Sequence, residues 1–202
     1  PLVDDSNLVL TPLGIHLTKL PVDPKLGKIL LWGALLGCFD PVATVAAALS
    51  SKSPFLVTVT GDSAEGGRRA LQQPQSDFLT IIVAFEGFEE SSNTGGPTRA
   101  RRYCEQNMLS YDTLREYREL RNSFVKEIAS IGLIDNSRNP NKPSVENGRF
   151  LLGGTRCNRH RKNRNLVVAV LAAGLYPNIA TTTSTPVSSS ALWSSNAAGS
   201  SS

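Results

Sequence analysis

The sequence predicts a mainly α-helical protein, and three observations support this prediction. A Thr-Pro pair at 11–12 and Asp-Pro pairs at 23–24 and 40–41 have the order of a helix cap followed by a first-turn proline. Apolar residues recur at three- and four-residue intervals behind these pairs. The longest such series runs from 111 to 131 and indicates one long amphipathic helix.

The N-terminal part predicts a short helix followed by a helical hairpin. Thr11 would cap the short helix, and Pro21 and Pro24 would interrupt it. Asp23 would cap the next helix. The inner stripe of that helix combines small and apolar residues: Leu26, Ile29, Leu30, Gly33, Ala34 and Gly37. Small residues at helical spacing let a second helix approach closely, and we expect that helix to begin with Asp40 as its cap.

The middle of the chain predicts two further helices. Ser76 would cap a helix that a polar, glycine-containing stretch at 89–97 interrupts. Ser110 would cap the longest helix, and Gly132 would end it. Charged residues, among them Arg121, lie between the apolar residues of this helix.

The last part of the chain is first polar, then basic, then apolar. Residues 135–154 are rich in Asn, Pro and Gly and predict a loop or linker. Residues 156–164 hold five Lys or Arg and one His in nine positions. Residues 166–180 form an apolar run whose periodicity fits either a helix or a strand. Beyond Thr181 the Ser/Thr/Ala composition offers little to bury, so weak order is expected.

Composition restricts the function classes only loosely. Hydrophobic residues make up 40% and charged residues 19%, as in soluble globular proteins, and the net charge of +4 permits nucleic-acid binding without requiring it. The three cysteines are far apart and form no CxxC pair, which favours an intracellular, reducing location over a zinc site or a disulfide framework. Cys38 and Cys104 are expected as small buried residues.

Neither a membrane span nor a signal peptide is expected. The longest apolar stretch, 29–48, is broken by the Asp-Pro pair at 40–41 and by glycines. The chain starts at Pro1 without an initiator Met, a basic region or an apolar signal core, so we expect a fragment of a longer protein.

The sequence contains no catalytic motif. It has neither a GxxxxGK[ST] phosphate loop nor a DExH quartet for Mg²⁺. His160 lies in the basic run without a Cys or carboxylate pattern for a metal, and His16 is expected as a surface or structural side chain. The prediction is therefore no catalytic residue, no metal and no cofactor in this chain.

Five sequence blocks carry a family resemblance. They are LTPLGIHLTKLPVDPKLGKILL at 10–31, GCFDPVATVAAALSSKSPF at 37–55, SDFL at 76–79, YCEQNMLS at 103–110 and AVLAAGLYPN at 169–178. In content and order these blocks resemble the C-terminal helicase-associated region of DEAH/RHA-type RNA helicases. The resemblance covers most of residues 7–180.

This resemblance implies a helical ratchet-type bundle with a partial winged helix before it and the start of an OB-fold after it. The implied boundaries are 1–20 for the end of the winged-helix domain, 21–134 for the ratchet domain, 135–165 for a polar and basic linker or insertion, and 166–202 for an OB-fold-like segment with a low-complexity tail. Three features depart from the family pattern. The sequence lacks the motor domains, the Arg-rich piece and the glycine stretch at 89–97 look like lineage-specific insertions, and the tail does not resemble further OB-fold strands.

The resemblance also implies a function. In such helicases the ratchet domain forms one wall of an RNA channel, opposite two RecA-like motor domains whose ATP cycle moves the strand. The implied partners are single-stranded or structured RNA, the RecA-like domains of the same parent, and a glycine-rich-patch or other ribonucleoprotein partner. ATP and Mg²⁺ would belong to the parent's motor, so the parent is expected to be an ATP-dependent RNA helicase and this fragment to be inactive alone.

The candidate RNA-contacting residues are cationic or amide side chains. They are Lys52, Arg68, Arg69, Arg99, Arg101, Arg102, Asn107, Arg159, Arg161, Lys162 and Arg164. An ordinary solvated charge is an equal alternative for any single arginine, and the run at 159–164 could either grip phosphate or flank a disordered loop. The residues expected in the core rather than as base-stacking platforms are Trp32, Phe39, Leu114, Leu120 and Phe124.

Two functions stay open on the sequence. One is RNA guidance within a helicase, and the other is a non-catalytic structural or protein-interaction module within a larger ribonucleoprotein. The coding sequence immediately upstream would separate them, because a phosphate loop and a DExH motif there would support the first. Salt-dependent binding of single-stranded RNA would test the RNA contacts, because contacts to phosphate release counterions.

Overall fold

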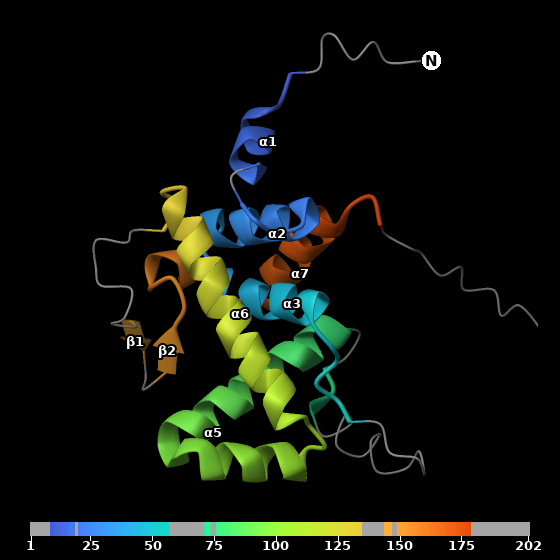
Figure 1. Ribbon diagram of the computed structural model, residues 1–202, viewed down its shortest axis with the longest axis vertical. Coiled ribbons are helices and arrows are strands. Elements are labelled where there is room, and N and C mark those ends of the chain that lie inside the picture. Colours follow the sequence, from blue (N-terminus) through green and yellow to red (C-terminus); the bar gives the residue numbers. More distant parts are fainter. Residues whose placement is uncertain are drawn as a thin grey trace, which may run out of the picture.

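The described part of the chain is mainly helical, as the sequence predicts. The computed structural model describes residues 9–18, 20–56, 71–73, 76–134, 144–146 and 149–178. Its elements are α1 (Pro12–Leu17), α2 (Pro24–Leu35), α3 (Phe39–Ser50), α5 (Asp77–Gln106), α6 (Tyr111–Ser130), β1 (Ser144–Glu146), β2 (Arg149–Leu151), the 3-10 turn η2 (Arg156–Asn158) and α7 (Arg164–Leu175). Figure 1 shows α6 crossing the α2–α3 pair and reaching α5, while α1 stands at one end of the helical body.

Helices α2 and α3 form the predicted hairpin. Asp23 caps α2 by accepting a hydrogen bond from the N–H of Lys25 at 2.8 Å, and Pro24 occupies the first turn. At Gly33 an added Cβ would lie 2.9 Å from Cγ1 of Val42 on α3, which is closer than real Cβ atoms come. Small residues therefore set the close approach of the two helices, as predicted.

The start of α3 differs from the prediction. The helix begins at Phe39 with Cys38 in the cap position, so Asp40 lies in the first turn and is not the cap. The carboxylate of Asp40 is buried, and its backbone N–H donates to Oδ1 of Asn158 at 2.7 Å. The capping side chain thus comes from 118 residues further along the chain, where no local pattern could indicate it.

Helix α5 bends sharply between two limbs. Ser76 caps it, as predicted. The stretch at 89–97, predicted to interrupt the helix, is helical except at Gly95 and Gly96, and Gly96 has a φ of +65°. Pro97 then lies in the first turn of the second limb. The predicted interruption is therefore confined to two glycines, because polar side chains are compatible with a largely exposed helix.

Helix α6 is the long amphipathic helix of the sequence prediction. Oγ of Ser110 caps it by accepting from the N–H of Thr113 at 3.3 Å, and Gly132, with a φ of +80°, follows its last turn. The buried apolar residues of this helix include Leu114, Tyr117, Phe124 and Ile128. Both predicted ends of the helix are confirmed.

Most residues predicted for the core are buried. Those at most 4% exposed are Cys38, Phe39, Cys104, Leu114 and Phe124. Leu120 is half-buried and packs against the main apolar cluster, which joins α2, α3, α5 and α6. Trp32 is 37% exposed, so its predicted core position is wrong. It falls outside the stripe of α2 that faces the other helices.

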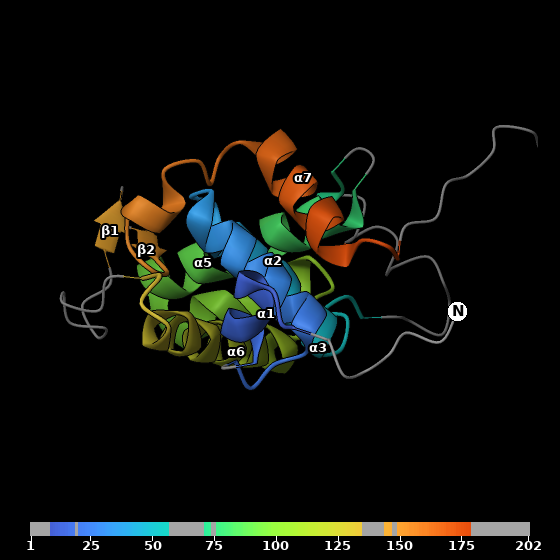
Figure 2. The ribbon, with the colours of Figure 1, turned by 90° about the horizontal axis from the view of Figure 1, so that it is seen from above.

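The C-terminal part folds onto the hairpin. Strand β1 pairs antiparallel with β2, and α7 packs against α2, beside which it lies in Figure 2. At Gly174 of α7 an added Cβ would lie 2.2 Å from Cγ1 of Ile29, so the two helices are in close contact. The apolar run is thus helical as far as Leu175. An OB-fold is built from strands, and 179–202 lie outside the described residues. The OB-fold and the winged helix stay predictions.

Candidate nucleic-acid interface

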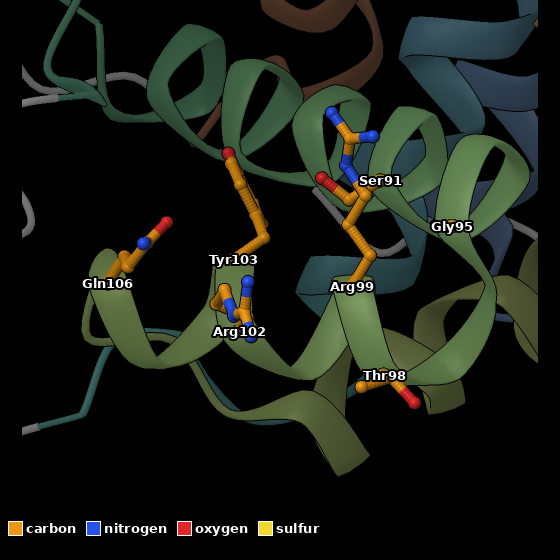
Figure 3. Close-up of a pocket in the computed structure, with 7 residues that line it drawn as sticks. All are labelled: Ser91, Gly95, Thr98, Arg99, Arg102, Tyr103 and Gln106. Carbon is orange, nitrogen blue, oxygen red and sulfur yellow. The ribbon is translucent and has the colours of Figure 1, made fainter.

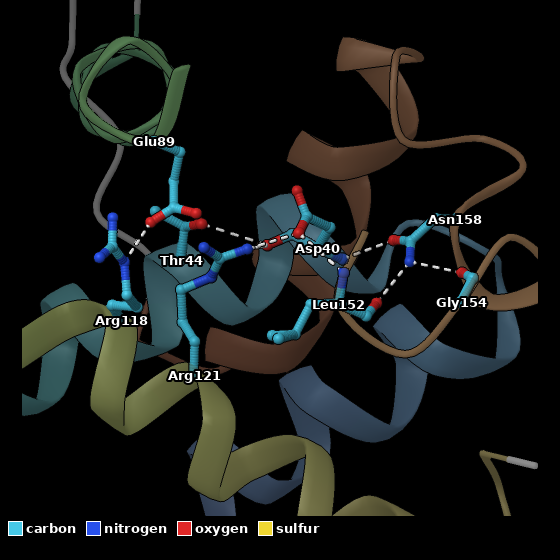
Figure 4. Close-up of polar contacts among 8 residues, drawn as sticks. All are labelled: Asp40, Thr44, Glu89, Arg118, Arg121, Leu152, Gly154 and Asn158. Carbon is cyan, nitrogen blue, oxygen red and sulfur yellow. Dashed lines mark hydrogen bonds and ion pairs between the residues drawn. The ribbon is translucent and has the colours of Figure 1, made fainter. Parts of the chain in front are cut away.

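Asn158 anchors the segment that carries the densest positive charge. Its side chain is buried, and its Oδ1 accepts from the N–H of Asp40 (Figure 4). Its Nδ2 donates to the carbonyls of Leu152 and Gly154. A buried amide is stable only when its polar atoms have such partners. The loop that leads to the basic residues is therefore fixed to the first turn of α3.

A buried ion pair lies beside this anchor. Oδ1 of Asp40 is 2.5 Å from Nη2 of Arg121 on α6, and both side chains are at most 5% exposed. The N–H of Leu152 donates to the same carboxylate oxygen at 3.4 Å. The guanidinium of Arg121 also lies 4.3 Å from the ring centre of Phe85. One carboxylate thus joins α3, α6 and the loop after β2.

Arg118 repeats this arrangement one turn earlier on α6. Its Nε is 2.6 Å from Oε1 of Glu89, and its guanidinium lies 4.9 Å from the ring centre of Phe88. Arg118 and Arg121, the paired arginines of α6, are therefore each matched by a carboxylate and an aromatic face within the protein.

The spacing of apolar residues in the sequence indicates that Arg121 is buried, although its charge suggests an exposed position. It lies four residues after Tyr117 and three before Phe124, both of which are buried. Residues at these intervals share one face of a helix. The spacing of the buried stripe, rather than the charge, was therefore the better guide to its position.

A second contact fixes the basic segment at the turn between α2 and α3. The N–H of His160 donates to the carbonyl of Gly37 at 2.7 Å. Gly37 has a φ of +72°, and an added Cβ would lie 2.8 Å from Cγ of Arg159. Both the backbone conformation and the approach of the arginine stem therefore require glycine here.

Residues 156–164, the basic turn, contain both of these anchoring contacts and end at Arg164, the first residue of α7. They include no acidic residue. The exposed cations of the turn are Arg156, Arg159, Lys162 and Arg164, while Arg161 is half-buried. Nη1 of Arg164 donates to the side-chain oxygen of Gln73. The described residues on both sides of the run pack against the hairpin.

The arginines of the second limb of α5 divide into two groups. The guanidinium of Arg101 lies 5.0 Å from the ring centre of Tyr111 at the start of α6. Arg99 and Arg102 instead line a pocket of about 540 Å³ between the two limbs (Figure 3). Neighbours in sequence therefore face different surroundings.

The remaining candidate residues do not gather at either place. Lys52 is exposed just after α3. Asn107 is half-buried at the C-terminal cap of α5, and its Nδ2 donates to the carbonyl of Tyr103 at 2.9 Å. Residues 68–69, both arginines, lie outside the described residues. Among the candidates at described positions, the structure brings residues together in the basic turn and in the α5 pocket.

Burial keeps the cysteine thiols protonated. It raises the pKa of Cys38 and of Cys104 to about 11, and it also raises the pKa of Cys157. All three are free, and a protonated thiol is a poor nucleophile at neutral pH. Over the described ranges, no three His, Cys, Asp or Glu residues come together as a metal site. No helix within the same ranges is long and apolar enough to cross a bilayer.

Comparison with known proteins identifies the class of this helical fold. The profile of the family described as "Helicase associated domain (HA2), ratchet-like" matches residues 23–81. That range contains the hairpin of α2 and α3 and the start of α5. The chain therefore contains a ratchet-like helicase-associated domain.

Its relatives define the family more closely. The chain is 37% identical over 178 residues to human ATP-dependent DNA/RNA helicase DHX36, covering 87% of this chain and 16% of the relative. It is 37% identical over 172 residues to DExH-box ATP-dependent RNA helicase DExH1 of Arabidopsis thaliana, covering 84% and 16%. For human ATP-dependent RNA helicase DHX29 the identity is 36% over 173 residues, covering 84% and 12%. The chain belongs to the helicase-associated region of DEAH/RHA-type helicases and spans about one sixth of the length of such relatives.

Proposed function

We propose that the chain is the RNA-guiding, ratchet part of an ATP-dependent DEAH/RHA-type RNA helicase, and that its basic turn holds the phosphate backbone of a single strand. RecA-like motor domains of the same parent would bind ATP and Mg²⁺ and supply the movement. A glycine-rich-patch or other ribonucleoprotein would be a further partner, and the location would be intracellular. The names of the relatives, which describe ATP-dependent helicases of RNA or of DNA and RNA, support this proposal.

One observation carries the proposal: the backbone of the basic turn is held on the hairpin, so the fold sets the positions from which its cations extend. Asn158 and Gly37 hold the turn on the hairpin, and Arg159 and Lys162 remain exposed. Holding charged groups in position lowers the entropy lost on binding. Exposed guanidinium and ammonium groups bind backbone phosphates without regard to base sequence, as a translocating strand requires.

The salt dependence of RNA binding tests this role. Each phosphate contact to a single strand contributes a slope of about −0.7 to the plot of log K against log salt concentration. The double variant R159Q/K162Q removes two cations of the turn. It should therefore reduce the magnitude of that slope by about 1.4, measured by fluorescence anisotropy with a labelled oligouridylate.

A matched control removes the same charge elsewhere. Arg115 and Lys126 are exposed on α6, and Arg115 makes only a surface pair with Glu119. R115Q/K126Q should leave the slope close to that of the wild-type chain. Equal slopes for the wild type and R159Q/K162Q would contradict the assignment of the strand to the basic turn.

A structural or protein-interaction module is the second candidate function. The end of α2 exposes three large apolar side chains: Trp32, Leu35 and Leu36. Exposed apolar surface of this kind is typical of protein interfaces when it is contiguous. Absence of RNA binding even at low salt would favour this second function.

A further inference from the structure

The bend of α5 creates a pocket that the proposal above does not use. The two limbs close on each other at Gly87, where an added Cβ would lie 2.3 Å from the hydroxyl of Tyr103. Between the limbs, near the bend, lies a pocket of about 540 Å³. The residues that line it are Ser91, Gly95, Thr98, Arg99, Arg102, Tyr103 and Gln106 (Figure 3).

This pocket carries two positive charges and no carboxylate. Arg99 and Arg102 line it, whereas no Asp or Glu does. Within the described ranges neither guanidinium has an ion-pair or hydrogen-bond partner. The paired arginines of α6 show the opposite arrangement, since each has its own carboxylate. Two guanidinium groups that line one pocket without a bonded carboxylate favour an anionic ligand.

Other polar side chains line the same pocket. They are Ser91, Thr98 and Gln106. The second limb also begins next to the pocket, at Pro97, and the positive end of its helix dipole adds to the field. Guanidinium, hydroxyl and amide donors together match the oxygens of a phosphate group.

The charge and the shape of the pocket favour a phosphomonoester over a phosphodiester. A phosphomonoester carries a charge of about −1.5 to −2 at neutral pH, which two guanidinium groups can balance. A phosphodiester carries a single negative charge and continues into nucleotides on both sides. The bend at 95–96 closes one end of the pocket (Figure 3). A terminal group therefore fits better than one inside a continuous strand.

We propose that the α5 pocket is a phosphomonoester site, in which Arg99 and Arg102 bind the phosphate oxygens and Ser91 donates from its hydroxyl. The phosphate could end a nucleic-acid strand or belong to a free nucleotide. In the first case the inference rests on the proposed function, because the rest of the strand would lie along the basic turn. In the second case it stands independently of that function.

Oligonucleotides of one sequence that differ only at their ends provide the test. The 202-residue chain is titrated with single-stranded RNA bearing a 5′-phosphate, a 3′-phosphate or hydroxyls at both ends, and with adenosine monophosphate. A strand-end site should bind one phosphate-ended strand about tenfold more tightly than the hydroxyl-ended strand. A free-nucleotide site should bind adenosine monophosphate and give no preference among the strands. Equal binding of all strands together with no binding of the nucleotide would overturn the proposal.

Three variants tie the result to the pocket. R99Q/R102Q should abolish the preference for phosphate, and S91E should do the same by placing a carboxylate beside the intact arginines. R115Q/K126Q should keep the preference, because it removes two charges far from the lining residues in sequence and on another helix. A preference that survives both R99Q/R102Q and S91E would overturn the proposal. Circular dichroism establishes that each variant is folded.

The basic-turn variant separates this inference from the proposed function. R159Q/K162Q should weaken the binding of every strand while keeping the ratio between phosphate-ended and hydroxyl-ended strands. Loss of that ratio in R159Q/K162Q, with R99Q/R102Q unaffected, would assign the terminal phosphate to the basic turn and overturn the α5 site.

Discussion

The paired arginines of α6 and the arginines of the basic turn use the same side chain for different purposes. Arg118 and Arg121 each lie between a carboxylate and an aromatic ring. Arg156 and Arg159 are exposed, in a segment without acidic residues. An arginine whose charge is balanced inside the protein stabilises the fold, whereas one that is fixed but uncompensated is available to an anion. Charge density in the sequence does not separate these cases, but burial and pairing do.

Breaking the buried pair should give the largest effect on stability. Asp40→Ala leaves Arg121 buried without its carboxylate, and loss of one partner of a buried pair costs about 3–5 kcal/mol. The control is Glu119→Ala, which breaks the exposed pair with Arg115 and should cost about 0.3–0.5 kcal/mol. Urea unfolding followed by circular dichroism measures both. Similar losses for the two variants would contradict a structural role for the buried pair.

Removing the anchor of the basic turn should have the next largest effect, on two properties at once. Asn158→Ala leaves the N–H of Asp40 and two carbonyls without their partner and should cost about 1–3 kcal/mol. RNA affinity should also fall, because the turn loses its fixed position. Asn122→Ala, at an exposed position of α6, should change neither property. Unchanged RNA affinity in a folded Asn158→Ala chain would show that the anchor does not matter for binding.

Two glycines with positive φ allow an effect on stability to be separated from an effect on RNA binding. Gly37 has Arg159 against it, whereas Gly132 has no atom within 4 Å of an added Cβ. Replacement by Ala should strain the backbone by about 1–2 kcal/mol at either position. Only Gly37→Ala should also displace the stem of Arg159 and weaken RNA binding. Equal RNA affinities for the two variants, measured by anisotropy, would count against this contact.

The smallest effect at physiological pH should come from the buried thiols. Burial raises the pKa of Cys38 and Cys104 from 9.0 to about 11, so the folded state keeps these protons where the unfolded state loses them. Their contribution to stability is therefore complete below pH 9 and is lost as the pH rises from about 9 to 11. C38A/C104A should show a shallower decline in the free energy of unfolding over this range than the wild type. An identical decline would assign the alkaline transition to other groups.

Local patterns in the sequence predicted the helix ends. They did not predict contacts between segments that are distant in the sequence. The caps found where they were predicted are Thr11, Asp23, Ser76 and Ser110. Asp40 also precedes a proline, yet its carboxylate pairs with Arg121 and its N–H is capped by Asn158. A cap depends on residues within one turn, so sequence reveals it. A buried ion pair depends on how helices pack, which a single sequence does not display.

The candidate site was predictable in composition but not in arrangement. The density of Lys and Arg at 156–164 marked the basic turn. Its attachment to Gly37 and to the start of α3 depends on contacts between residues more than a hundred positions apart. The α5 pocket depends on a bend at two glycines, inside a polar, glycine-containing stretch that the sequence predicted to interrupt the helix as a whole. Counting Lys and Arg in the sequence identifies candidate binding residues. It does not reveal which residues surround them, because backbone conformation and long-range contacts decide that geometry.

The side-chain Nε–Hε signals of the arginines in a two-dimensional ¹⁵N spectrum, followed during titration with hydroxyl-ended single-stranded RNA, test the central comparison most directly. The signals of Arg156 and Arg159 should shift as the strand binds the basic turn. The signals of Arg118 and Arg121 should not shift, because the guanidinium groups of these residues are already paired with carboxylates of the protein. Shifts of the paired arginines of α6, with the signals of the basic turn unmoved, would contradict the account.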